Sequence, residues 1–283
     1  MNKTAERLLT FFIGIPIVLG CAAITWCSYL PLHIAILIAT ILTSFELHGI
    51  LSKSMCTQNK ALTIILSALI PLMTSLTVIL NLPFETVIIS MTTSVMMVFI
   101  VEIWGYDRTT RSFDKSLQRV SSSLLIVIYS GGLISFISRM AAFSNASAFI
   151  CLFLLIIFGC DSCAWFFGVT MGKNNKGYVA ASPNKSIMGF VGGYVGPFIS
   201  IAVAIFFFPV LKTYPLWKLF VLAIATSTFA ILGDLVESVL KRSSNTKDSG
   251  NIIPGRGGLL DSVDSVIFSA PVYYLLVRIL LGM

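Results

Sequence analysis

The sequence contains few charged residues, and this scarcity excludes a soluble globular protein. Only 11% of its 283 residues are Asp, Glu, Lys or Arg, whereas 57% are hydrophobic and the mean hydropathy is +0.94. Soluble domains carry about 25% charged residues, which water solvates at the surface. The chain is therefore expected to be an integral membrane protein.

Histidine is also scarce, and the cysteines do not indicate a metal or redox centre. The chain has two histidines and six cysteines. Cys160 and Cys163 have the spacing of a metal or redox pair, but nothing else in the sequence supplies the remaining ligands of a zinc site. Most of the cysteines lie inside apolar segments, where they are ordinary packing residues, so no disulfide framework is expected.

Apolar segments of about 20 residues, the length that crosses a bilayer, recur along the whole chain. They predict an all-α fold, a polytopic transmembrane helical bundle, with nine spans at residues 8–29, 31–50, 61–80, 86–104, 120–138, 146–168, 187–209, 217–240 and 263–281. The first span follows Lys3 and Arg7 as in a signal peptide, but no small-residue cleavage pattern stands out, so it is expected to be retained. Residues 1–283 then form one membrane domain. Residues 1–145 are an apolar half with little chemistry, and residues 146–283 carry the active site.

The net charge of +7 reflects orientation in the membrane rather than a nucleic-acid partner. Basic residues alternate between the two sides of the predicted spans. One side has most of them, and the other has only Arg139, Lys212, Lys218 and Arg278. By the positive-inside rule the basic-rich side is cytoplasmic, which places the N-terminus and the loop 241–264 in the cytoplasm.

A polar segment at residues 238–265 separates two apolar runs and combines aspartates, cations and glycines. Carboxylates bind divalent cations, Lys and Arg bind phosphates, and glycine lets backbone N–H groups approach an anion. Asp261 and Asp264 are three residues apart in the first turn of the last predicted span, so both can reach one Mg²⁺. The turn Gly255-Arg-Gly-Gly258 precedes this helix and suits a phosphate. The segment predicts phosphoanhydride chemistry at the membrane surface.

Three acidic residues, Asp161, Asp234 and Glu237, fall inside predicted spans, where charge is costly and usually faces a protein interior or a wet cavity. Asp161 and Asp234 lie at similar depths, roughly 10 Å from the cytoplasmic ends of their helices. They are expected to line a pocket open to the cytoplasm, which Ser182 and Lys185 reach from a neighbouring loop.

An alternative for these three acids is a cation or proton-coupled transporter. Their crowding towards one membrane face argues against it, because a conduction path needs polar groups through the midplane. In the apolar half, Glu46, His48 and Glu102 lie near the cytoplasmic boundary and are interpreted as interfacial or packing residues.

At its polar segments the chain resembles the phosphatidate cytidylyltransferases, also called CDP-diacylglycerol synthases. Their signature reads approximately Ser-x-x-Lys-Arg, Lys-Asp, Pro-Gly-His-Gly-Gly and Asp-Arg-x-Asp-Ser. The chain matches it at Ser238, Lys241, Arg242, Lys247, Asp248, Pro254, Gly255, Gly257, Gly258, Asp261, Asp264 and Ser265. Upstream blocks around Asp161, Ser182 to Ser186 and Gly233 to Ser238 are also similar, so the resemblance is specific from about residue 160 to 265.

Three positions depart from the family pattern: Arg256 stands where the family has His, Ser262 where it has Arg, and Met188 where it commonly has Glu. Arg256 is hypothesised to replace the basic charge that Ser262 no longer supplies. A CDP-alcohol phosphatidyltransferase is not expected, because its Asp-x-x-Asp-Gly-x-x-Ala-Arg pattern is absent from the sequence.

The resemblance implies that CTP and phosphatidic acid react to give CDP-diacylglycerol and pyrophosphate, at the cytoplasmic face of a bacterial inner membrane and with Mg²⁺. The partners are then CTP, phosphatidic acid and membrane lipids, with no nucleic acid; the oligomeric state stays open, a homodimer included. Asp161 and Asp234 either hold a second cation or orient the lysines. The expected catalytic residues are Asp248, Asp261 and Lys247; the substrate-binding residues are Lys185, Ser182, Asp161, Lys241, Arg242, Arg256, Gly257 and Gly258; the metal ligands are Asp248, Asp261, Asp264 and Asp234.

Overall fold

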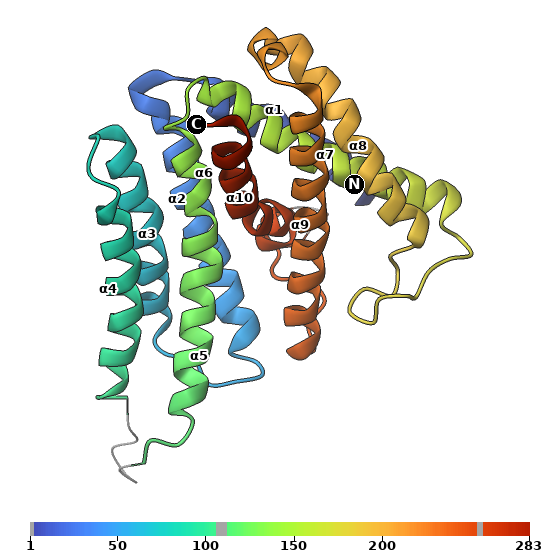
Figure 1. The fold of residues 1–283 in the computed structure, drawn as a ribbon. Helices are drawn as coiled ribbons and strands as arrows, with labels where there is room; N and C mark the ends of the chain where they lie inside the picture. The colour runs from blue at the N-terminus through green and yellow to red at the C-terminus, as the bar shows by residue number, and fades with distance from the viewer. Residues whose placement is uncertain (1–2, 106–111, 254–256) are drawn as a thin grey trace.

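The computed structural model describes residues 3–105, 112–253 and 257–283, with only the backbone for residues 3–12. These residues form helices and loops, with no strand in the described part of the chain (Figure 1). The helices are α1 Lys3–Ala23, α2 Trp26–Leu51, α3 Lys60–Ile79, α4 Glu85–Glu102, α5 Ser116–Ile126, η1 Val127–Leu133, α6 Ser135–Met140, α7 Ala146–Met171, α8 Ile187–Phe207, η2 Pro209–Thr213, α9 Leu216–Ser243 and α10 Leu260–Leu281.

The length and composition of these helices confirm a multi-pass membrane protein. Eight spans are long and apolar enough to cross a bilayer: α2, α3, α4, the continuous run α5–η1–α6, α7, α8, α9 and α10. The ninth, α1, has an apolar part at Ile13–Ala23. Large apolar side chains such as Ile65, Phe206 and Ile279 are exposed on the outside, as expected for surfaces that face lipid. The predicted bundle of about nine spans is confirmed.

The boundary between the first two spans differs from the prediction. The first span was expected to reach residue 29, but α1 ends at Ala23 and α2 begins at Trp26. Cys27, Ser28 and Tyr29 have φ values of 49°, 52° and 67°, so the chain turns in the left-handed region here. The Tyr29 hydroxyl accepts a hydrogen bond from the Ser147 N–H (3.1 Å), which ties this turn to the start of α7. Hydropathy alone does not reveal such a turn, because the residues around it are largely apolar.

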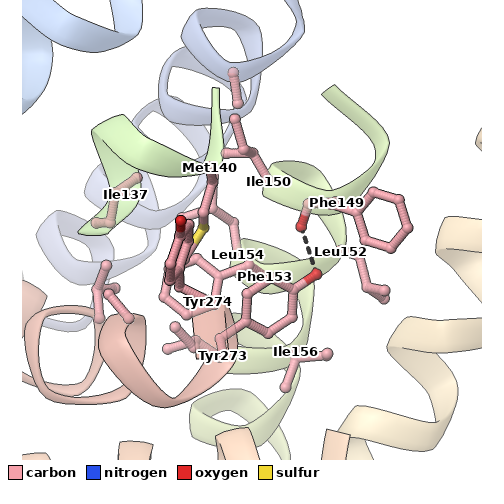
Figure 2. Close-up of a cluster of buried hydrophobic side chains, with 14 of the residues drawn as sticks. Ile137, Met140, Phe149, Ile150, Leu152, Phe153, Leu154, Ile156, Tyr273 and Tyr274 are labelled. Atoms are coloured by element: carbon pink, nitrogen blue, oxygen red, sulfur yellow. Dashed lines mark hydrogen bonds between the residues drawn. The ribbon is translucent and has the colours of Figure 1, made fainter. Parts of the chain in front are cut away.

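A buried aromatic cluster fixes α10 against α7 (Figure 2). Tyr273 is fully buried, its ring lies 4.9 Å from that of Phe153, and its hydroxyl donates a hydrogen bond to the Phe149 carbonyl (2.7 Å). Tyr274 stacks on Phe143 at 5.2 Å. Buried aromatic pairs stabilise by about 0.5–1.5 kcal/mol beyond the area that they bury. The cluster therefore sets where the polar N-terminal end of α10 lies.

The helices α7 and α8 pack closely against each other through small residues. A Cβ atom added to Gly196 of α8 would lie 2.0 Å from the Gly159 carbonyl oxygen of α7, so only glycine permits this approach. In Figure 1 these two helices lie on the side of the bundle opposite α3 and α4. The packing matters for function, because α7 carries Asp161 and the loop between α7 and α8 carries Lys185.

Candidate active site

A polar cavity of about 480 Å³ lies where α7, α9 and α10 meet the loop between α7 and α8. Its size suits a small-molecule ligand. Among the described residues, five carboxylates and three lysines line it, together with polar and apolar side chains; these charged residues are Asp161, Lys176, Lys185, Asp234, Glu237, Lys241, Asp261 and Asp264. Acids from three separate helices thus share one cavity, as the sequence predicted.

The loop between α7 and α8 closes one side of the cavity. Lys185 forms an ion pair with Asp234 of α9 (2.5 Å), and both side chains are partly exposed. Ser186 caps α8, because its hydroxyl accepts a hydrogen bond from the Gly189 N–H (3.1 Å). Ser182, which was predicted to bind substrate, lines the cavity beside Lys185.

The side chain of Lys241 lines the cavity and lies between two acidic side chains. Its Nζ atom pairs with Glu237, one turn earlier in α9, and with Asp261 Oδ1 of α10 (2.6 Å). All three side chains are largely buried, with Glu237 only 1% exposed. Removing one member of a buried ionic group leaves uncompensated charge and typically costs about 3–5 kcal/mol. The buried triad of Glu237, Lys241 and Asp261 therefore holds α9 against α10 at the cavity.

Asp261 is surrounded by hydrogen-bond donors. Besides Lys241, its Oδ2 atom accepts hydrogen bonds from the Ser249 N–H (2.9 Å), the Ser249 hydroxyl (2.9 Å) and the Gly258 N–H (2.8 Å). The residue next to Gly258 is also constrained: Gly257 has a φ of 109°, and a Cβ atom there would lie 2.6 Å from Asp261 Oδ2. Asp261 thus holds Ser249 and Gly258 close to each other.

The other predicted site residues lie in different surroundings. Asp264 is buried, lines the cavity and accepts a hydrogen bond from the Ser265 N–H (2.6 Å). Asp248, Lys247 and Arg242 are exposed, and the described residues that line the cavity include none of them. Arg242 instead donates a hydrogen bond to the Thr246 carbonyl (3.3 Å). Arg256 lies outside the described residues, so its proposed compensation for Ser262, which lines the cavity, stays a prediction.

The expected metal trio of Asp248, Asp261 and Asp264 is not assembled. Within the described ranges, no three His, Cys, Asp or Glu side chains are placed to hold a metal ion. Asp261 already accepts four hydrogen bonds, and Asp248 is exposed. In the described part of the chain, more carboxylates than lysines nevertheless line the cavity, which fits a divalent cation. Mg²⁺ commonly uses only one or two protein carboxylates and takes its other ligands from water and substrate phosphates.

The sequence interpretation missed one residue near this site, Glu46 of α2. Its carboxylate accepts hydrogen bonds from the Leu259 and Leu260 N–H groups at the start of α10 (2.9 and 2.7 Å). The available signal was an ionisable residue inside an otherwise apolar segment, which usually faces a protein interior. By contrast, Glu102 joins Gln58 and Arg119 in a hydrogen-bonded network, as expected for a packing residue.

Comparisons with known proteins agree with the cavity's chemistry. The model of the cytidylyltransferase family matches residues 5–280 of the chain. The phosphatidate cytidylyltransferase of Staphylococcus haemolyticus is 40% identical over 153 residues, which are 54% of this chain and 57% of that protein. The phosphatidate cytidylyltransferase of Bacillus subtilis is 43% identical over 126 residues, 44% of this chain and 45% of that protein. The chain spans about half the length of the curated relatives that it matches.

Proposed function

Because the chain belongs to the cytidylyltransferase family, we propose that it transfers the cytidylyl group of CTP to phosphatidic acid, giving CDP-diacylglycerol and pyrophosphate. The observation that carries the proposal is the cavity between α7, α9 and α10, in which lysines and carboxylates from the signature segments meet at the ends of membrane-spanning helices. The names of the relatives support the choice of phosphatidic acid as the acceptor.

The reaction needs charge neutralisation more than proton abstraction. A phosphate oxygen of phosphatidic acid attacks the α-phosphorus of CTP, and the bond from that phosphorus to the oxygen bridging to the β-phosphate breaks as pyrophosphate leaves. The attacking phosphate is already ionised, so the protein has to hold two anions together and in line. Lys176, Lys185 and Lys241 supply positive charge for this task, and no histidine is required.

Asp234 and Asp264 would hold Mg²⁺, since both line the cavity. When bound, the ion would neutralise charge on phosphate oxygens of the substrate. Asp261 is assigned a different role from the one expected: it holds Lys241, Ser249 and Gly258 in place. Lys185, which forms an ion pair with Asp234, is assigned to the nucleotide or lipid phosphate.

The cavity is proposed to face the cytoplasm of a bacterial cell, at the inner membrane. The basic residues of the loops around it support this orientation through the positive-inside rule. The transporter alternative has no finding in its favour, because Asp161, Asp234 and Glu237 share one cavity with the α10 acids.

The proposal is tested by measuring pyrophosphate release from CTP by the purified protein in detergent. Release is expected only when phosphatidic acid and Mg²⁺ are both present, and diacylglycerol, which lacks the attacking phosphate, is the control lipid. Pyrophosphate release without phosphatidic acid, or none under any of these conditions, would reject the proposed reaction.

A further inference from the structure

Glu46 is a buried carboxylate in the half of the chain that carries none of the family signature. It lies near the C-terminal end of α2, is 4% exposed and has the apolar neighbours Phe45 and Leu47. A buried charge is strongly unfavourable unless hydrogen bonds or ion pairs satisfy it. The partners of Glu46 therefore indicate what this carboxylate does.

Those partners are the backbone groups that begin α10. Glu46 Oε1 accepts a hydrogen bond from the Leu259 N–H (2.9 Å), and Oε2 accepts one from the Leu260 N–H (2.7 Å). The first N–H groups of a helix have no partner inside the helix, and its N-terminal end favours negative charge. The apolar side chain of Leu259, at the N-cap position, cannot accept these hydrogen bonds. Glu46 thus caps α10 from a helix more than 200 residues earlier in the chain.

Two glycines let the chain close around this carboxylate. A Cβ atom on Gly258 would lie 2.6 Å from Glu46 Oε2, and one on Gly250 would lie 2.8 Å from Glu46 Oε1. Both distances are shorter than van der Waals contact. Gly250 and Gly258 therefore lie directly against the Glu46 carboxylate.

The Ser249 hydroxyl connects Glu46 with the cavity. Its oxygen lies 3.3 Å from Glu46 Oε2 and 2.9 Å from Asp261 Oδ2, so its single proton is shared between two carboxylates. Asp261 in turn pairs with Lys241. A continuous chain of contacts therefore runs from Glu46 through Ser249 and Asp261 to Lys241 of the cavity.

We infer that Glu46 is a positioning residue for the proposed cytidylyl transfer: it holds Ser249, Gly258 and the first turn of α10 so that Asp261 keeps Lys241 in the cavity. Glu46 lies outside the set of described residues that line the cavity, so it acts through Asp261 rather than on substrate. The inference rests on the proposed function for its kinetic part and on geometry alone for its structural part.

The test compares Glu46→Gln with Glu102→Gln as a matched control. Both residues are buried glutamates of the first half, but Glu102 pairs with Arg119 and Gln58. The amide of Glu46→Gln keeps the size of the side chain but presents N–H groups where an acceptor is needed. Two quantities are measured for the full-length protein in detergent: amide hydrogen exchange of the segment formed by residues 249–253 and 257–260, and kcat and KM for CTP.

The expected result for Glu46→Gln is faster exchange of this segment together with a fall in kcat of about tenfold or more, because small misplacements of reacting groups can cost this much. The KM for CTP should stay within about twofold, since Glu46 provides no binding contact in this account. Glu102→Gln should change neither the exchange of the segment nor kcat.

Faster exchange without a loss of kcat, a loss of kcat without faster exchange, or equal effects of Glu102→Gln would each overturn the inference. If Glu46→Gln does not fold, hydrogen exchange and kinetics are measured for Ser249→Ala instead, and the same outcomes support or overturn the inference. This variant removes the hydroxyl between Glu46 and Asp261. The exchange measurement needs no substrate. An inactive wild-type protein with faster exchange in Glu46→Gln would therefore reject the proposed reaction and leave the structural role of Glu46 supported.

Discussion

Lys241 and Asp261 form a largely buried ion pair (2.6 Å) that joins α9 to α10 at the cavity. Lys241 also pairs with Glu237, so one ammonium group serves two carboxylates. The other carboxylate oxygen of Asp261 accepts hydrogen bonds from Ser249 and Gly258. The pair therefore links the packing of α9 on α10 to the positions of Ser249 and Gly258 in the loop between these two helices.

Replacing Lys241 should both inactivate and destabilise the protein. In Lys241→Met two buried carboxylates lose their counter-charge, and we expect a loss of about 3–5 kcal/mol in the free energy of unfolding. Thermal unfolding in detergent and CTP turnover measure the two effects. Lys212→Met is the control, because Lys212 is exposed in η2. A Lys241→Met protein as stable as wild type would contradict the buried triad.

Lys185→Ala should weaken catalysis while the protein stays folded. Its ion pair with Asp234 is partly exposed and contributes little to stability, so the main loss is a cation for a substrate phosphate. Hydrogen bonds to charged groups contribute about 1.5–3 kcal/mol, which predicts a fall in kcat/KM of about 10- to 100-fold.

The control for Lys185→Ala is Lys53→Ala, which removes an exposed lysine from the loop between α2 and α3. Equal kinetics of the two variants would remove Lys185 from the substrate site. Unfolding of Lys185→Ala would show instead that the pair with Asp234 is structural.

Asp261→Asn and Asp248→Asn should differ in turnover, although the sequence analysis assigned both aspartates to one metal ion. Asp261 is held by four hydrogen bonds, so Asp261→Asn should reduce turnover below about a tenth of wild type, a barrier change of more than about 1.4 kcal/mol. Asp248 is exposed, and Asp248→Asn should retain more activity than Asp261→Asn. Steady-state turnover at saturating Mg²⁺ measures the difference, and equal inactivation would restore the paired assignment.

Gly196→Ala should loosen the packing of α7 on α8. The added methyl group would meet the Gly159 carbonyl, and overpacking of this kind costs about 1–3 kcal/mol. Gly49→Ala is the matched control, because a Cβ atom at Gly49 of α2 has no described neighbour within 4 Å. Thermal unfolding in detergent compares the two variants, and an unchanged Gly196→Ala protein would contradict the close approach of the helices.

Most of the fold was predictable because bilayer thickness sets the length of a membrane-spanning helix. All seven predicted spans that follow the second one begin and end within about four residues of the observed helices. A margin of this size is normal for helix boundaries predicted from sequence. The turn at Cys27 to Tyr29 was not predictable, because largely apolar residues continue through it. The positive φ values of these residues and the contact of Tyr29 with Ser147 are features of the folded chain and leave no pattern in the sequence.

Part of the site was predictable from helical spacing. Asp161 and Asp234 were placed by their depth in their helices, and Asp261 and Asp264 by their spacing of three residues in the first turn of the last span. All four line the cavity. Asp248 and Lys247 follow the end of α9, where spacing along the chain does not determine the direction of a side chain. The contact between Glu46 and α10 joins distant segments and leaves no periodic signal in the sequence.

The most direct measurement of the proposed activity follows the α-phosphate of CTP. With the purified protein, phosphatidic acid and Mg²⁺, a label on the α-phosphate should pass into the lipid phase as CDP-diacylglycerol, while a label on the γ-phosphate should remain in water as pyrophosphate. An α-label that stays in water, or that enters lipid at the same rate with Lys241→Met as with wild type, would contradict the account of the cavity.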